Sequence, residues 1–113
     1  MIGYEKLINK TEDYIEENLT EKITLDMLAK YLNISKYYYH HIFSMNSNET
    51  IKEFITRVKM ERSAIYLVVN KSISITDIAL KYGYNDSSSY NKAFKKFFGV
   101  NPTQYRKARN DKQ

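Results

Sequence analysis

Apolar residues recur along this chain every three to four positions, the spacing that places them on one face of an α-helix. The first predicted helix, from about Tyr4 to Asn18, has an apolar stripe that consists of Leu7, Ile8, Tyr14, Ile15 and Leu19. No stretch of four to eight residues keeps a clean two-residue alternation, and the chain contains only three Gly and one Pro. The pattern therefore predicts an all-α fold.

Capping residues divide the pattern into seven predicted helices. These helices cover residues 4–18, 25–32, 35–46, 50–70, 74–83 and 86–98, with a last one that begins at Pro102. Thr50-x-x-Glu53 opens the longest helix with a capping-box pattern, and Gly99 suits a left-handed C-terminal cap. Asn101 caps the last helix, where Pro102 lacks only an N–H that would be unpaired anyway.

The chain contains an internal repeat, which bears on every motif within it. At a shift of fifty residues, Ile23, Leu25, Leu28 and Ala29 align with Ile73, Ile75, Ile78 and Ala79. After one inserted residue the aligned pairs are Tyr39 with Tyr90, Ile42 with Ala93, Phe43 with Phe94, Asn48 with Gly99, Thr50 with Asn101 and Glu53 with Gln104. Because these positions are core residues, turn formers and caps, each half is predicted to encode the same supersecondary unit.

That unit reads as a helix-turn-helix. In the second copy Ala79 is small enough for a close helix crossing, and Gly83 supplies the positive φ that the turn needs. The first copy has Ala29 followed by Asn33, a residue that tolerates the left-handed conformation. An αα-hairpin that only packs within the fold is the alternative; two copies with polar second helices favour the helix-turn-helix.

Composition indicates a folded domain that meets a polyanion. The 113 residues suit one compact domain, and 42% of them are apolar. Residues 1–56 carry six Lys/Arg against nine Asp/Glu, whereas residues 57–113 carry twelve against four. A basic half of this kind is the footprint of a nucleic-acid-binding surface, although basic charge alone is weak evidence.

Several functional classes find no support in the sequence. There is no Cys, no Gly-rich phosphate loop and no convincing close carboxylate pair, so we expect no enzyme and no cofactor. His40 and His41 are adjacent and point about 100° apart on a helix, which excludes a helical pair of metal ligands. No signal pattern or membrane-length apolar run occurs, so we expect a cytoplasmic protein without a membrane partner.

The second helix of each unit has a polar side that contains no acid. The inward stripes are predicted to be Tyr39, Ile42 and Phe43 in one unit and Tyr90, Ala93, Phe94 and Phe97 in the other. The outward residues are then Lys36, Tyr37, His40, His41 and Ser44, and Ser88, Asn91, Lys92, Lys95 and Lys96. Asn suits adenine edges, Lys and His suit guanine acceptors, and a Tyr ring suits a thymine methyl.

Ordinary explanations exist for the same residues. Lys95 and Lys96 could be a solvated helix face, and if they bind DNA they suit phosphate better than bases. A protein-interaction module with a basic face is the main rival function. RNA is a weaker candidate, because the major groove of A-form RNA does not admit such helices.

The long helix supplies a geometric argument for DNA. About twenty residues span about 30 Å, close to the roughly 34 Å of one duplex turn. We therefore expect the two second helices to enter successive major grooves, so that a monomer reads a long asymmetric site.

The chain resembles the DNA-binding domain of the AraC/XylS family of transcription activators, from about Tyr4 to Arg109. The stretch Ser74-Ile-Thr-Asp-Ile-Ala-Leu-Lys-Tyr-Gly-Tyr84 and the later Phe94-Lys-Lys-Phe-Phe-Gly-Val-Asn-Pro-Thr-Gln-Tyr-Arg106 look like the family signature. The resemblance implies two helix-turn-helix subdomains, residues 1–49 and 71–113, joined by a linker helix at 50–70. It also implies a monomer or weak dimer that binds double-stranded promoter DNA and recruits RNA polymerase.

When the family's base-contacting positions are transferred to this sequence, the resemblance implies one group of base-contacting residues in each unit. These sets are Lys36, Tyr37, His40 and His41, and Ser87, Ser88, Asn91 and Lys92. The sequence departs from the family pattern at His41, where Arg is common, at Asn48, where Gly is usual, and at Ser89-Tyr90. A His lacks the bidentate fork and the permanent charge of Arg. The specificity of the first unit is therefore the property that can be carried over from the family with least support.

Family members often carry an effector-binding domain, and none fits within 113 residues. Met1 directly precedes the first helix, as in members whose sensing domain follows the DNA-binding domain. The chain is thus expected to be an N-terminal fragment of a longer regulator, or else a free-standing regulator controlled by its abundance. The basic tail from Arg106 to Gln113 ends without a helix-terminating cap, which favours the interpretation as a fragment.

Overall fold

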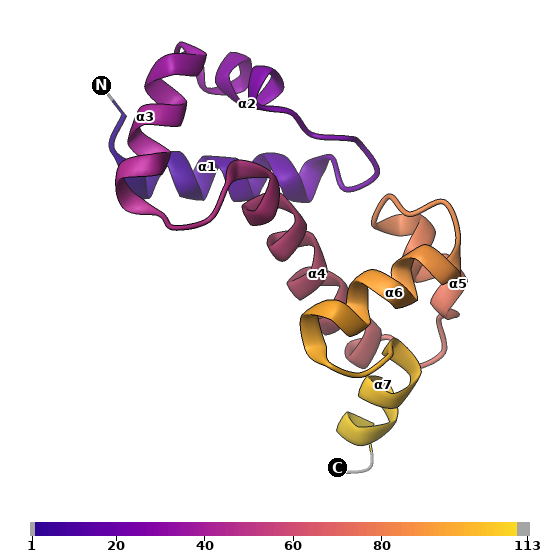
Figure 1. The fold of residues 1–113 in the computed structure, drawn as a ribbon. Helices are drawn as coiled ribbons and strands as arrows, with labels where there is room; N and C mark the ends of the chain where they lie inside the picture. The colour runs from indigo at the N-terminus through magenta and orange to yellow at the C-terminus, as the bar shows by residue number, and fades with distance from the viewer. Residues whose placement is uncertain (1, 111–113) are drawn as a thin grey trace. The chain divides into compact units, whose positions relative to one another are not determined.

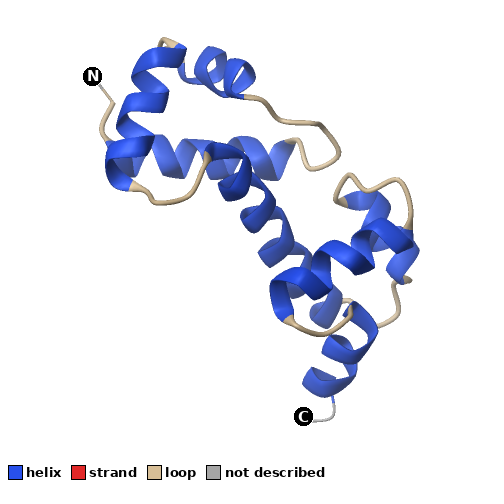
Figure 2. Cartoon of the chain, in the orientation of Figure 1, coloured by secondary structure: helices blue, strands red, loops and turns tan. Residues whose placement is uncertain are grey.

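The computed structural model describes residues 2–110, so residues 111–113 of the basic tail lie outside the described part. Within residues 2–110 the structure contains seven helices and no strand, which confirms the predicted all-α fold (Figures 1 and 2). The helices are α1 Tyr4–Glu17, α2 Leu25–Leu32, α3 Lys36–Asn46, α4 Ile51–Val69, α5 Ile75–Lys81, α6 Ser87–Phe98 and α7 Pro102–Asn110.

The chain divides into two compact units, Met1–Val58 and Lys59–Gln113. The boundary falls within α4, so this helix contributes its first half to one unit and its second half to the other. In the first unit α1 packs against α2 and α3, and α2 packs against α3; in the second unit α6 packs against α5 and α7. The predicted role of residues 50–70 as a linker stays a prediction.

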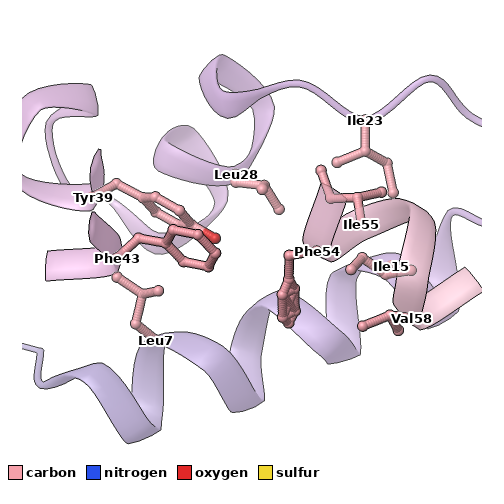
Figure 3. Close-up of a cluster of buried hydrophobic side chains, with 9 residues drawn as sticks. All are labelled: Leu7, Ile15, Ile23, Leu28, Tyr39, Phe43, Phe54, Ile55 and Val58. Carbon is pink, nitrogen blue, oxygen red and sulfur yellow. The ribbon is translucent and has the colours of Figure 1, made fainter. Parts of the chain in front are cut away.

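The first unit is held together by nine buried apolar side chains drawn in Figure 3. They come from all of its helices and from the segment before α2, and they are Leu7, Ile15, Ile23, Leu28, Tyr39, Phe43, Phe54, Ile55 and Val58. Burial of each large side chain contributes about 1.5 to 3 kcal/mol. Because Phe54, Ile55 and Val58 belong to α4, the start of that helix completes the first core.

Local capping begins α4 and α7 in the same way. The Thr50 N–H donates to Glu53 Oε1 at 2.8 Å, and the Glu53 N–H donates to Thr50 Oγ1 at 3.0 Å. Asn101 and Gln104 exchange the equivalent two bonds at 3.2 and 2.8 Å. These reciprocal bonds satisfy N–H groups that have no partner within the helix.

The structural repeat extends beyond the repeat predicted from the sequence. At a shift of fifty-two residues, α1 aligns with the second half of α4, and the pairs are Thr11 with Ser63, Tyr14 with Tyr66, Ile15 with Leu67 and Asn18 with Asn70. The Asn18 side-chain amide donates to the Tyr14 carbonyl at 2.8 Å, and Asn70 donates to that of Tyr66 at 3.1 Å. Each unit is therefore built from four helical segments in the same order, and α4 supplies the last of one and the first of the other.

Candidate nucleic-acid interface

The turn between α2 and α3 has the same geometry as the turn between α5 and α6. The Ile34 N–H donates to the Ala29 carbonyl at 3.0 Å, and the Tyr84 N–H donates to the Ala79 carbonyl at 2.9 Å. Asn33 has φ 56°, and Gly83 has φ 90°. These bonds across a left-handed residue close the end of the first helix and turn the chain sharply, as the sequence predicted.

The second helix of each unit starts at a side-chain cap. Ser35 Oγ accepts from the Tyr38 N–H at 3.0 Å, and Asp86 Oδ1 accepts from the Ser89 N–H at 2.8 Å. The bond from the Ser89 backbone lowers the pKa of Asp86 below its usual value, because it stabilises the ionised carboxylate. The carboxylate of Asp86 also interacts favourably with the positive end of the α6 dipole.

A buried tyrosine anchors each of these helices. Tyr39 and Tyr90 are fully buried. The Thr11 hydroxyl donates to the Leu7 carbonyl at 2.7 Å, which leaves Tyr39 to donate to Thr11 across 2.6 Å. Tyr90 likewise donates to Ser63 Oγ at 2.9 Å. Each bond fixes the rotation of its helix, because a buried hydroxyl without a partner is costly.

The outward side of α3 is mainly aromatic. Tyr37 is 79% exposed, and its ring stacks on that of His41 with centroids 5.9 Å apart and planes 8° apart. His40 is also exposed, and the Ser44 hydroxyl, which donates to the His40 carbonyl, lies 3.3 Å from His40 Nδ1. The sequence prediction that these side chains point away from the core agrees with their exposure.

Lys36 has an acidic neighbour that comes from another helix, although the outward side of α3 has no acid of its own. Its Nζ lies 3.1 Å from Asp26 Oδ1, and both side chains are exposed. The acid belongs to the first turn of α2, so it was not visible from the residues of α3 alone. An exposed ion pair of this kind contributes at most about 1 kcal/mol to stability.

The outward side of α6 is polar and basic. An open hollow of about 330 Å³ follows this side and is lined by Ser88, Ser89, Lys92, Ala93 and Lys96. Successive helix residues are rotated by about 100°, which places Lys92 opposite the buried Tyr90 and Phe94. Lys92 is therefore at the centre of this side, and Lys95 is an exposed residue at its edge.

One predicted orientation on α6 is wrong, and two other residues are intermediate between inward and outward. Phe97, predicted to face inward, is 42% exposed, and Ala93 is half-buried and lines the hollow. Asn91, predicted to face outward, is half-buried, and its side-chain amide donates to the Ser87 carbonyl at 2.6 Å. Ser87, one helical turn before Asn91, is half-buried on the same side of α6.

Two exposed residues at the interface were missed by the sequence prediction. Ser89 lines the hollow on α6, and Met45 on α3 is 70% exposed. Met45 follows His41 by four residues, as His41 follows Tyr37, so the helical period alone could have identified it. The internal repeat aligns Met45 with Lys96, which also lies on the outward side of its helix.

Two further properties concern the described part of the chain. Among residues 2–110, His, Cys, Asp and Glu side chains form no group of three or more that is arranged to hold a metal ion. No helix in that range has the length and apolar character needed to cross a membrane.

Comparison with known proteins identifies the same motif. A family profile described as a helix-turn-helix domain matches residues 28–108. The chain is 37% identical over 100 residues to the Msm operon regulatory protein of Streptococcus mutans. That match covers 88% of this chain and 36% of the relative, so the chain spans about a third of the relative's length.

Two solved structures share the fold. The C-terminal domain of AraT, a response regulator from Geobacillus stearothermophilus, superposes with a TM-score of 0.74 at 28% identity, covering 90% of this chain and 84% of that domain. The DNA-binding domain of the transcription factor AdpA, solved with a target DNA, gives a TM-score of 0.76 at 16% identity. That match covers 94% of this chain and 95% of the AdpA domain, and at this identity it concerns the fold alone.

Proposed function

Because this chain belongs to the AraC/XylS family of helix-turn-helix transcription regulators, we propose that it binds promoter DNA in a sequence-specific manner through α3 and α6. The observation that carries the proposal is the repeated unit: both copies present an exposed side of the second helix that contains no acid of its own. An α-helix fits the major groove of B-DNA, where base edges are distinguishable. Two copies of the unit therefore provide two helices that can contact base edges.

In the second unit we propose that Lys92 contacts a base and that Ser88, Ser89 and Lys96 extend the contact along the groove. Lysine suits the acceptors of guanine, and serine suits several base edges. Lys95 is exposed at the edge of this surface and suits a phosphate contact, whereas Asn91 and Ser87 are half-buried beyond that edge and are the least favoured of the predicted contacts. In the first unit the corresponding residues are Lys36, Tyr37, His40 and His41.

We further propose that α3 and α6 enter successive major grooves. Support comes from α4, whose 19 residues run without interruption from one unit into the other. A helix of that length spans about 28 Å, close to one duplex turn. Under this proposal residues 50–70 serve as the linker, and one chain or a weak dimer reads a long asymmetric site.

The regulatory role of the whole protein is also a proposal. The Streptococcus mutans relative is named as an operon regulatory protein, and this chain spans 36% of its length. We propose that this chain, too, regulates transcription in the cytoplasm, with RNA polymerase as a second partner and without catalysis of its own.

The test is a selection of bound duplexes from a random DNA pool, followed by titration of the recovered duplex and of an unrelated one. Lys92→Ala should weaken binding to the recovered duplex by about 1 to 3 kcal/mol and to the unrelated one by less. Lys6→Ala, an exposed lysine of α1, is the charge-matched control and should leave both affinities nearly unchanged. Failure to enrich any sequence, or binding that ignores salt, would contradict the proposal.

A further inference from the structure

The two outward helix faces differ in chemistry although they occupy equivalent places in the repeat. The outermost residues of α3 are Tyr37, His41 and Met45, which form a line with four-residue spacing. Aligned with them on α6 are Ser88, Lys92 and Lys96. We call these sets the α3 ridge and the α6 ridge. The first has no permanent charge, and the second has two.

The formal charges of the two units differ in the same sense as the two ridges. Residues 1–58 contain seven Lys/Arg and nine Asp/Glu, for a formal charge of −2, and residues 59–113 contain eleven and four, for +7. The single lysine of α3, Lys36, is already paired with Asp26. Arg57, the arginine of the first unit, forms a bond of 2.6 Å with Glu49. The first unit therefore has a net negative formal charge, and two of its seven cations are already paired with carboxylates.

The side chains of the α3 ridge are nevertheless strongly exposed. Tyr37 is 79% and Met45 is 70% exposed, and the Tyr37 and His41 rings already stack on each other. Exposed apolar surface is unfavourable in water unless a partner covers it. In the major groove the one apolar feature of a base edge is the C5-methyl group of thymine.

From this juxtaposition we propose that the α3 ridge reads thymine methyl groups, so that the first unit recognises an A·T-rich half-site by apolar contact. The basic residues of the second unit outside the α6 ridge then supply most of the phosphate attraction. This inference rests on the proposed function and specifies how the two units share it. It predicts that sequence preference in one half-site is independent of salt, whereas total affinity depends on salt through the other unit.

The experiment uses the whole chain and the duplex recovered from the random pool. In one half of the duplex at a time, every thymine is replaced by deoxyuridine, which removes only the methyl group. Replacement in the half read by α3 should weaken binding about fourfold for each contacted methyl, from roughly 0.8 kcal/mol per buried carbon group. Replacement in the other half should have less effect.

Variants assign the effect to the ridge. Tyr37→Ser with Met45→Ser should bind the thymine and uracil duplexes equally and keep the salt slope of the parent chain. Lys95→Ser should keep the uracil effect and flatten the slope of log affinity against log salt by about 0.9 for the lost phosphate contact. Val69→Ser, at a residue that is 71% exposed on α4, is the control for loss of an exposed apolar side chain.

Two results would overturn the inference while leaving DNA binding intact. One is a recovered duplex without thymine in either half or without any response to uracil. The other is a Tyr37→Ser/Met45→Ser variant that still distinguishes uracil from thymine as the parent does. A parent chain that binds no duplex at all would instead remove the proposed function, and this inference with it.

Discussion

At the scale of single residues, the two buried tyrosines determine how α3 and α6 pack within their units. Tyr90 has no exposed surface, and its only polar atom donates to Ser63 Oγ at 2.9 Å. Ser63 in turn donates to the Met60 carbonyl at 2.8 Å. The chain of bonds links α6 to the second half of α4, and Tyr39 and Thr11 link α3 to α1 in the same way.

Tyr90→Phe should therefore destabilise the chain by about 1 kcal/mol, because Ser63 loses a partner in a buried place while the ring remains packed. Urea unfolding followed by circular dichroism measures the change. Tyr105→Phe is the control, since the Tyr105 hydroxyl accepts an exposed bond from Arg109 at 3.1 Å and should contribute less. Equal stability of the Tyr90→Phe variant and the parent would show that the bond contributes nothing.

Alkaline pH should also act through these tyrosines. Burial raises the pKa of Tyr39 and of Tyr90 from 10.0 to about 12. The folded state thus holds both phenol protons more tightly than the unfolded state, so this contribution is complete below pH 10 and is lost as the pH rises through 12. We expect a loss of about 1 to 2 kcal/mol per tyrosine, measured by urea unfolding between pH 9 and 12.

The control for the alkaline effect is the variant with both Tyr39→Phe and Tyr90→Phe. It lacks the two protons and should lose less stability than the parent over the same range. Lysine side chains titrate there in both proteins, so only the difference between the two is interpreted. If the stability of the double variant falls as steeply with rising pH as that of the parent, the two phenols are not responsible for the alkaline loss of stability.

At the scale of elements, the turns show why much of this fold was readable from sequence. A cap or a left-handed turn depends on residues within about five positions, so Asn33, Gly83, Gly99 and the Thr50–Glu53 pair could each be predicted locally. The seven helices follow from these signals. The conformation required at Asn33 and Gly83 is the same, although the two residues differ.

This equivalence leads to a prediction for the turns. Gly83→Ala should cost about 1 to 2 kcal/mol, because φ 90° is unfavourable for a residue with a Cβ. Asn33→Gly, at φ 56°, should change stability by only a few tenths. Thermal unfolding of both variants measures the difference. A Gly83→Ala variant as stable as Asn33→Gly would mean that the second turn relaxes without strain.

Helix rotation was the part of the candidate site that could not be read from sequence. Phe97 has the composition of a core residue, yet it is exposed, whereas Asn91 is turned toward the core. The side of α6 that is buried is determined by α5 and α7, which pack against it, and by the Tyr90–Ser63 bond to α4. A small error in the predicted direction of the buried side changes which side chains are assigned to the boundary between the buried and exposed sides. The central residue Lys92 was predicted because it lies far from either edge.

At the scale of the whole molecule, the outstanding feature is that one helix belongs to both units. The sequence repeat did not reveal this, because the alignment of α1 with the second half of α4 pairs Thr11 with Ser63 and Ile15 with Leu67 and needs a third shift. Arg106 of α7 donates to the Leu67 and Asn70 carbonyls at 2.9 and 3.1 Å, which caps the end of α4. The helix is thus stabilised at both ends by side chains.

If α4 couples the two units on DNA, weakening it should reduce binding as well as stability. Ile65 is 59% exposed on α4, so Ile65→Gly should cost about 1 kcal/mol of helix stability relative to Ile65→Ala, without a change in the core. On the recovered duplex, Ile65→Gly should bind several-fold more weakly than Ile65→Ala, because a flexible connection lowers the effective concentration of the second unit once the first is bound. On a duplex that keeps only one half-site, the two variants should bind alike. If the glycine variant bound both duplexes as the alanine variant does, the units would act without help from a continuous helix, and the linker role of residues 50–70 would be refuted.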